Sequence, residues 1–264
     1  MASRLGRGFP VSSAPGALAY RTASAAPTKT VTIDSIGSGG LSNGTGGTSV
    51  SWQHYVSGNA VVVGMNYYNT SSVAVPGSVK IGTKLLNLLG NTQFYNPSVG
   101  YVTAFLYGLL NPPTGLQTLS CTMSGTNGVA TNSVSYFNVG GFGLYQVTTG
   151  TTTTASQTVT AGSNSRIFNI IISGNNNPTG YSQNQLYSVA GSPAVYPNCL
   201  IGDAAGNASV TFSATVPSGG GGWASAAVPL INPWAVIADT TPATQTYYNE
   251  PSAQIPVSVP RARL

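Results

Sequence analysis

The segment SVSWQHYVSGNAVVVGMNYY, from Ser49 to Tyr68, decides the predicted fold. Its first part alternates in polarity, so that one face of a strand carries Val50, Trp52, His54 and Val56. The run from Ala60 to Val63 is continuously apolar, which is typical of a strand buried on both faces. Between the two strands lies Ser57-Gly58-Asn59, and we expect Gly58-Asn59 to supply the positive φ angles of a tight hairpin.

The same signals continue from Thr30 to about Asn232: short β-forming runs, polar turns and no helical periodicity. We expect two short strands around Pro76-Gly77 within 73–89, and further strands at about 30–36, 101–110, 116–123, 130–139, 144–148, 156–160, 166–173, 200–203, 208–216 and 223–230. In the run 116–123 the predicted core face carries Gln117, Leu119, Cys121 and Met123. The Thr-rich run 148–154 is a loop or an edge strand, and 200–203 with 208–216 is expected to form a hairpin.

These patterns predict an all-β chain, folded as an antiparallel two-sheet β-sandwich of jelly-roll or immunoglobulin-like type. No internal repeat is evident in the sequence.

Residues 175–192 are rich in Asn, Gln and Ser and are expected to form a long polar surface loop, which makes them a candidate recognition segment.

The composition narrows the class of protein. Charged residues make up only 5% of the chain, against about 25% in ordinary globular proteins. Apolar residues make up 41%, which argues against a disordered chain of the charged kind. Abundant Gly, Ser, Thr, Asn and Tyr with so little charge are typical of extracellular or virion proteins built of β-strands.

The positive charge lies at the two ends. Between Thr30 and Pro260 three basic and four acidic residues give a charge of −1 (three minus four), although the whole chain carries +5. We expect an extended N-terminal docking arm over 1–29, the β-sandwich over 30–232 and a proline-rich C-terminal arm over 233–264. The expected partner-binding residues are Arg4, Arg7, Phe9, Arg21, Trp234, Tyr247, Tyr248, Arg261 and Arg263. No basic cluster lies on the body, so no nucleic-acid binding is expected.

Catalytic chemistry has little support in the sequence. His54 is the sole histidine, and its phase with Trp52 predicts a hydrogen-bonded structural residue rather than a catalytic base. We therefore expect no enzyme, no cofactor and no metal site. Cys121 and Cys199 are expected to be buried thiols, with a disulfide left open. No apolar run reaches the ~18 residues of a membrane span, so no membrane insertion is expected.

Carbohydrate binding is an alternative use of the tyrosines, because their rings stack on sugars while neighbouring amides form hydrogen bonds. The eligible residues are Tyr67, Tyr68, Tyr95, Tyr181 and Tyr187. Tyr181 and Tyr187 in the predicted 175–192 loop are the first candidates. Tyrosines at subunit contacts are the competing interpretation.

Five segments of the body resemble a β-sandwich domain that recurs in minor tail proteins of actinobacterial, mycobacteriophage-type tailed phages. They are SVSWQHYVSGNAVVVGMNYY, GTKLLNLLG, YVTAFLYGLLNPPTGLQTLSCTMSG, SVSYFNVG and LIGDAAGNASVTFSATVPSGGGGWASAAVPL. The start RLGRGFP resembles the short basic beginnings of small virion proteins of these phages. The resemblance implies a structural virion protein of the tail tip or fibres, with host contact and no catalytic residues.

Three functions are therefore open. The first is a minor tail protein anchored to other virion proteins, and to copies of itself as a homo-oligomer, through its arms. The second is a capsid decoration or head-fibre protein with the same arms. The third is an adhesion module that binds a glycan of the host cell wall.

Overall fold

A computed structural model describes residues 29–43, 49–69, 76–97, 100–123, 128–174, 177–189, 198–217 and 221–233. This part of the chain consists of β-strands and their connections and contains no helix. The strand pairs are all antiparallel, so the predicted all-β antiparallel class is confirmed. The structure has four sheets, however, where two were predicted.

The first half of the body forms sheets A and B. Sheet A has the order β1-β10-β4-β8-β7, with β2 also paired to β10, and sheet B has the order β3-β9-β5-β6. Their strands are β1 (Thr32–Ile36), β2 (Gly40–Asn43), β3 (Ser49–Val56), β4 (Ala60–Asn69), β5 (Ser78–Ile81), β6 (Lys84–Leu85), β7 (Asn87–Asn96), β8 (Gly100–Leu110), β9 (Gly115–Thr122) and β10 (Gly128–Phe137).

The second half forms sheets C and D. Sheet C has the order β11-β18-β14-β16-β15, with β12 also paired to β18, and sheet D consists of β13 and β17. Their strands are β11 (Gly141–Phe142), β12 (Gln146–Gly150), β13 (Thr154–Val159), β14 (Arg166–Ser173), β15 (Asn184–Val189), β16 (Asn198–Ala205), β17 (Val210–Thr215) and β18 (Trp223–Ile231).

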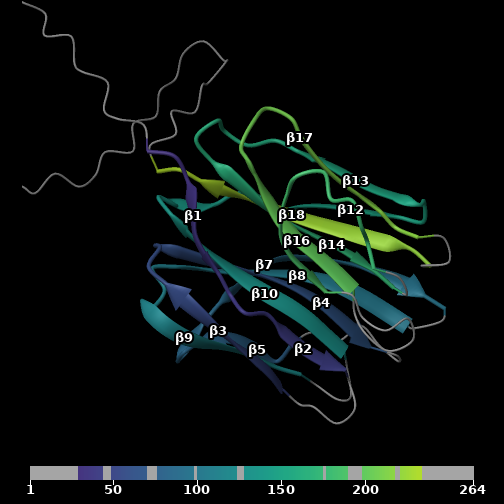
Figure 1. The fold of residues 1–264 in the computed structure, drawn as a ribbon, viewed down its shortest axis with the longest axis horizontal. Helices are drawn as coiled ribbons and strands as arrows, with labels where there is room; N and C mark the ends of the chain where they lie inside the picture. The colour runs from purple at the N-terminus through teal and green to yellow at the C-terminus, as the bar shows by residue number, and fades with distance from the viewer. Residues whose placement is uncertain are drawn as a thin grey trace, which may run out of the picture.

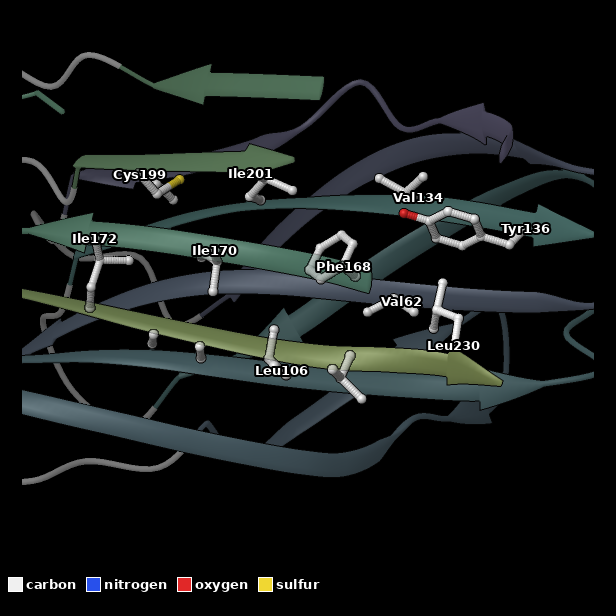
Figure 2. Close-up of a cluster of buried hydrophobic side chains, with 14 of the residues drawn as sticks. Val62, Leu106, Val134, Tyr136, Phe168, Ile170, Ile172, Cys199, Ile201 and Leu230 are labelled. Carbon is white, nitrogen blue, oxygen red and sulfur yellow. The ribbon is translucent and has the colours of Figure 1, made fainter. Parts of the chain in front are cut away.

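The four sheets stack in the order B, A, C, D (Figure 1). The apolar layer between sheets A and C is the central core, and it contains Val62, Leu106, Phe168, Ile170 and Ile201 (Figure 2). A second core lies between sheets A and B, and two smaller clusters lie between sheets C and D. Sheets A and C are therefore covered on both faces, which explains why Ala60 to Val63 are all fully buried, as predicted.

The two halves repeat one strand order, although no repeat is evident in the sequence. In sheet A the strands run β1/β2, β10, β4, β8, β7, and in sheet C their counterparts run β11/β12, β18, β14, β16, β15. The pair β3-β9 of sheet B likewise corresponds to the pair β13-β17 of sheet D. The repeat is thus one of topology that the sequence does not reveal, and among the described strands of the first half only β5 and β6 lack a counterpart strand.

The segment 177–183 occupies the place that β5 and β6 take in the first half. It follows β14 as β5 follows β4, and it lies along the edge of β17: Thr179 exchanges two backbone hydrogen bonds with Thr215, and the Ser182 N–H donates to Ser213 O. The ring of Tyr181 packs against the clusters between sheets C and D. The predicted long loop 175–192 is therefore wrong, because 177–183 covers a sheet edge and β15 is a strand of sheet C.

The predicted hairpin around Ser57-Gly58-Asn59 is also wrong. Strand β3 pairs with β9 in sheet B, whereas β4 pairs with β8 and β10 in sheet A. The connection is a corner between two sheets, and neither Gly58 nor Asn59 has a positive φ. Glycine is required at position 58 because a Cβ there would overlap the backbone carbonyl of Tyr136.

The predicted hairpin of 200–203 and 208–216 is wrong for the same reason. Strand β16 belongs to sheet C and β17 to sheet D, so the turn between them is another corner. The predicted faces are nevertheless correct, since Val50, Trp52, His54 and Val56 all point into the A–B layer and are buried. Leu119, Cys121 and Met123 are buried as well, whereas Gln117 at the start of this face is only half-buried.

Substitution of Gly58 by alanine tests the corner. The new methyl group would push the β3–β4 connection away from β10, so we expect Gly58→Ala to lower the free energy of unfolding by about 2 kcal/mol. Gly141→Ala is the control, because nothing lies within 4 Å of a Cβ at that position. Denaturant unfolding of both variants measures the difference, and equal stability of the two would contradict the corner geometry.

Candidate functional site

The two ends of the described body meet at one place, which we call the exit pole. The side-chain amide of Asn232 donates to the carbonyl oxygen of Lys29. The N–H of Gly140 donates to Ile231 O at 2.7 Å, and Pro233 lies directly beside Gly140. Lys29 and Pro233, the outermost described residues of the body, thus lie at the same end of it.

The expected partner-binding residues lie outside the described residues. They are Arg4, Arg7, Phe9, Arg21, Trp234, Tyr247, Tyr248, Arg261 and Arg263. Their contacts with partners stay a prediction, and the exit pole adds only the point from which both segments start.

His54 is the centre of a buried polar cluster in the A–B layer. Its imidazole is 1% exposed and lies between β3, β1 and β10. The Trp52 indole N–H donates to the Ser133 hydroxyl (2.8 Å), and this hydroxyl lies 2.6 Å from Nδ1 of His54. Nε2 of His54 lies 2.8 Å from the Ser35 hydroxyl and 3.0 Å from the Ser135 hydroxyl.

Asp34 completes the cluster and also fixes the β3–β4 corner. Its Oδ2 accepts hydrogen bonds of 2.7 Å each from the Ser135 hydroxyl and from the backbone N–H groups of Ser57 and Gly58. Partial burial raises the pKa of the Asp34 carboxyl, but these hydrogen bonds outweigh it and lower the pKa overall. The carboxylate therefore ties β1, the corner and β10 together.

One set of proton positions satisfies the whole cluster. The Ser133 hydroxyl accepts from Trp52 and donates to Nδ1 of His54, which therefore carries its proton on Nε2. Nε2–H then donates towards Ser35 and Ser135, and the Ser35 hydroxyl donates to Tyr55 O. In this neutral tautomer His54 offers a lone pair only to Ser133, which is fully buried.

This geometry does not match that of a hydrolytic triad. A catalytic base must accept the proton of an accessible nucleophile and be oriented by a third group on its other nitrogen. Here Asp34 contacts a serine rather than the imidazole, and the half-buried Ser35 accepts from the imidazole instead of donating to it. The interpretation of His54 as a structural residue fits these contacts.

Burial lowers the pKa of His54 from 6.5 to about 4, although the charge of Asp34 acts in the opposite direction. Between pH 6.5 and pH 4 the unfolded chain therefore binds a proton that the folded chain excludes, so stability falls as the pH falls. We expect a loss of about 2 kcal/mol in unfolding free energy between pH 7 and pH 5.

Because His54 is the sole histidine, a His54→Gln variant should lose this slope, whatever its absolute stability. Urea unfolding at several pH values measures both slopes. A wild-type chain equally stable at pH 7 and pH 5 would contradict the buried neutral imidazole.

A buried ion pair lies in the A–C layer beside the exit pole. Arg166 on β14 donates through Nε and Nη2 to the fully buried Asp203 on β16, the Nη2–Oδ1 distance being 3.0 Å. Oδ1 of Asp203 also accepts from the Asn184 amide (2.9 Å), and the Tyr136 hydroxyl of sheet A lies 3.4 Å from Oδ2. The hydrogen bond to Asp203 raises the pKa of Arg166, and burial raises that of Tyr136. The pair thus joins the two halves.

Removal of the arginine alone should leave a buried, unpaired carboxylate. We expect Arg166→Met to lower the free energy of unfolding by about 3 kcal/mol, and the double change Arg166→Met with Asp203→Leu to restore most of it. Lys80→Met is the control, because Lys80 is exposed on sheet B and should change stability by less than about 0.5 kcal/mol. Denaturant unfolding distinguishes these cases, and a harmless Arg166→Met would contradict the role of the pair.

The two tyrosines first proposed to bind glycans pack within the body. The Tyr181 ring lies against Gly202 and 6.2 Å from the Phe212 ring, and its hydroxyl donates to Asn169 Oδ1 at 2.9 Å. The Tyr187 ring packs against Gly39 and the central core, and burial raises its pKa to about 12. A role of either in glycan binding stays a prediction.

Tyr95 is the eligible tyrosine that the structure leaves most open to solvent, and Tyr68 is half-buried at the end of β4. It lies on the edge strand β7, is 57% exposed and contacts Tyr101 of β8, with 5.2 Å between ring centroids. Tyr67, by contrast, is 1% exposed in the A–B layer. Sequence analysis missed Tyr101. A turn that starts at Asn96-Pro97 and joins two antiparallel strands places Tyr101 opposite Tyr95, as the register of β7 and β8 shows.

Cys121 and Cys199 are both buried as free thiols, in sheets B and C respectively. Within the described residues no three His, Cys, Asp or Glu side chains gather as metal ligands. A search of the same part of the chain finds no helix that could cross a membrane.

Comparison with protein-family models, curated proteins and solved structures finds no match.

Proposed function

We propose that each half of the body is a β-sandwich of the jelly-roll type. A jelly roll pairs its first, eighth, third and sixth strands in one sheet and its second, seventh, fourth and fifth in the other. Sheet A follows the first order as β1/β2, β10, β4, β8, and sheet B follows the second as β3, β9, β5, β6. Strand β7 is then an added edge, and the second half is a reduced copy in which segment 177–183 replaces two strands.

On this basis the chain is a structural protein of a phage virion, in first place a minor tail protein of the tail tip or fibres. The observation that carries this proposal is the exit pole, where Lys29 and Asn232 bring both terminal segments to one end of the body. Segments that start together act as one anchor for a projecting body. Jelly rolls are common in viral capsid and lectin domains, which favours a virion role.

The anchor would act through the charged and aromatic residues of the two segments. Arg4 and Arg7 offer planar donors for carboxylates or carbonyls of a neighbouring subunit, and Phe9 offers an aromatic side chain for an apolar pocket. Body charges are few, so the ends supply most of the electrostatic attraction to other virion proteins. Assembly around a symmetric tail would also place copies of the chain beside each other.

A capsid decoration or head-fibre protein is the second candidate, because jelly rolls also build viral capsid domains. The two locations differ in stoichiometry. Quantitative mass spectrometry of purified particles separates them, since a tail-tip protein is present in a few copies and a decoration protein in hundreds.

Deletion of residues 2–20 tests the anchor. These residues contribute no strand to the described body, so we expect the truncated chain to fold with an unchanged melting temperature but to be lost from assembled particles. Particle composition, measured after the truncated chain replaces the full one, shows the result.

A finer comparison uses substitutions within the same segment. Combined replacement of Arg4, Arg7 and Phe9 by alanine should reduce incorporation at least tenfold, whereas replacement of Ser12, Ser13 and Thr22 by alanine should leave it unchanged. Normal incorporation of the deleted chain would overturn the anchoring role.

A further inference from the structure

The outer margin of sheet A carries a row of exposed side chains on the edge strand β7. From Gly90 onward the strand alternates strictly, so that Asn91, Gln93 and Tyr95 point to solvent while the intervening residues point into the A–C layer. The row lies on the side of sheet A that faces sheet B, but β7 is the outermost strand of its sheet. At about 3.4 Å per residue the three side chains span about 14 Å.

Strand β8 supplies the second ring beside this row. Tyr101 is the direct partner of Tyr95 in the register of β7 and β8, and the two ring planes are inclined at 58°. The next partners on β8, Thr103 and Phe105, are buried. Two rings therefore form one end of the row, and the two amides of Gln93 and Asn91 extend it along the strand. We call these four residues the β7 strip.

The two amide side chains are available to a ligand. Among the described residues neither the Asn91 nor the Gln93 side chain has a hydrogen-bond partner, and both are exposed. An exposed carboxamide offers two donors and an acceptor, which matches the alternating donor and acceptor character of sugar hydroxyls. A tyrosine ring beside it offers an apolar face on which the C–H face of a pyranose can stack.

The four residues of the strip, and the strands β7 and β8 that carry them, are uncharged. No charged residue occurs between Lys84 and Arg166, a range that includes β7, β8 and β10. The nearest cation in the sequence is Lys84, exposed on β6 just before β7, so a phosphate, a sulfated glycan or an acidic peptide would meet no countercharge on the two strands that carry the strip. The chemistry of the strip therefore fits a ligand with many hydroxyl groups and no net charge.

We propose that the β7 strip, made of Asn91, Gln93, Tyr95 and Tyr101, binds a neutral oligosaccharide. Tyr95 provides the stacking surface, Tyr101 holds the Tyr95 ring in place and extends it, and the two amides hydrogen-bond to successive hydroxyl groups. The contact uses only body residues, so it is independent of the anchoring role of the terminal segments.

The experiment uses the purified full chain on an array of neutral glucans, mannans, galactans, arabinans and chitin oligosaccharides, followed by calorimetric titration of the strongest ligand. We expect Tyr95→Ala to weaken binding at least tenfold, and Gln93→Ala to weaken it several-fold. Tyr55→Ala is the matched control: Tyr55 is similarly exposed, at 60%, but pairs with Leu116 on sheet B, away from β7. It should bind within twofold of the wild type.

Three results would overturn the proposal. The first is no binding of the wild-type chain to any neutral oligosaccharide on the array. The second is equal binding by the wild type and Tyr95→Ala, once near-UV circular dichroism shows that the variant is folded. The third is a Tyr95→Ala variant whose sedimentation mass falls without any sugar present, which would assign the strip to a contact between copies of the chain.

Discussion

The apolar contact between sheets A and C, made by side chains such as Val62, Leu106, Phe168 and Ile201, is the interaction on which the rest of the body depends. It buries the second face of two sheets whose first faces are already covered by sheets B and D. Strands in such a position have no solvent-facing side on which to place lysine or glutamate. The stacking of four sheets therefore contributes to the low charge content of 5%, and the exposed positions of the outer sheets carry mostly hydroxyl and amide side chains.

Buried polar groups are confined to positions where they tie elements together. Asp34 and His54 join β1, β3 and β10 at the β3–β4 corner, and Arg166 and Asp203 join sheet C to Tyr136 of sheet A. Asn169 connects Tyr181 to Ser225 between sheets C and D. Each of these contacts joins different elements of the fold, and a partner left unsatisfied at such a site costs more than the bond contributes. They specify which strands meet, where apolar packing alone would accept several registers.

The strands and their faces follow from the sequence, because a period of two is a local property that burial imposes on each segment. Which strand belongs to which sheet does not follow from the sequence. A tight hairpin and a corner between sheets use the same polar and glycine-rich residues, and the choice at Ser57-Gly58-Asn59 depends on Tyr136, which is distant in sequence. The repeat is invisible for a related reason: the two halves share a strand order and not residue identities, and the place of β5 is taken by segment 177–183, which pairs with β17 only at isolated hydrogen bonds. The exposure of Tyr95 likewise depends on the edge position of β7, which local periodicity does not encode.

The shared exit of the two ends has a mechanical consequence. A force applied to the chain through both terminal segments enters and leaves at Lys29 and Asn232, so its path through the body is almost zero in length. The load falls on the first residues of β1 and the end of β18, while the four-sheet stack lies outside the line of tension. When both segments are held by the same anchor, no tension therefore runs through the cores between the two points of attachment.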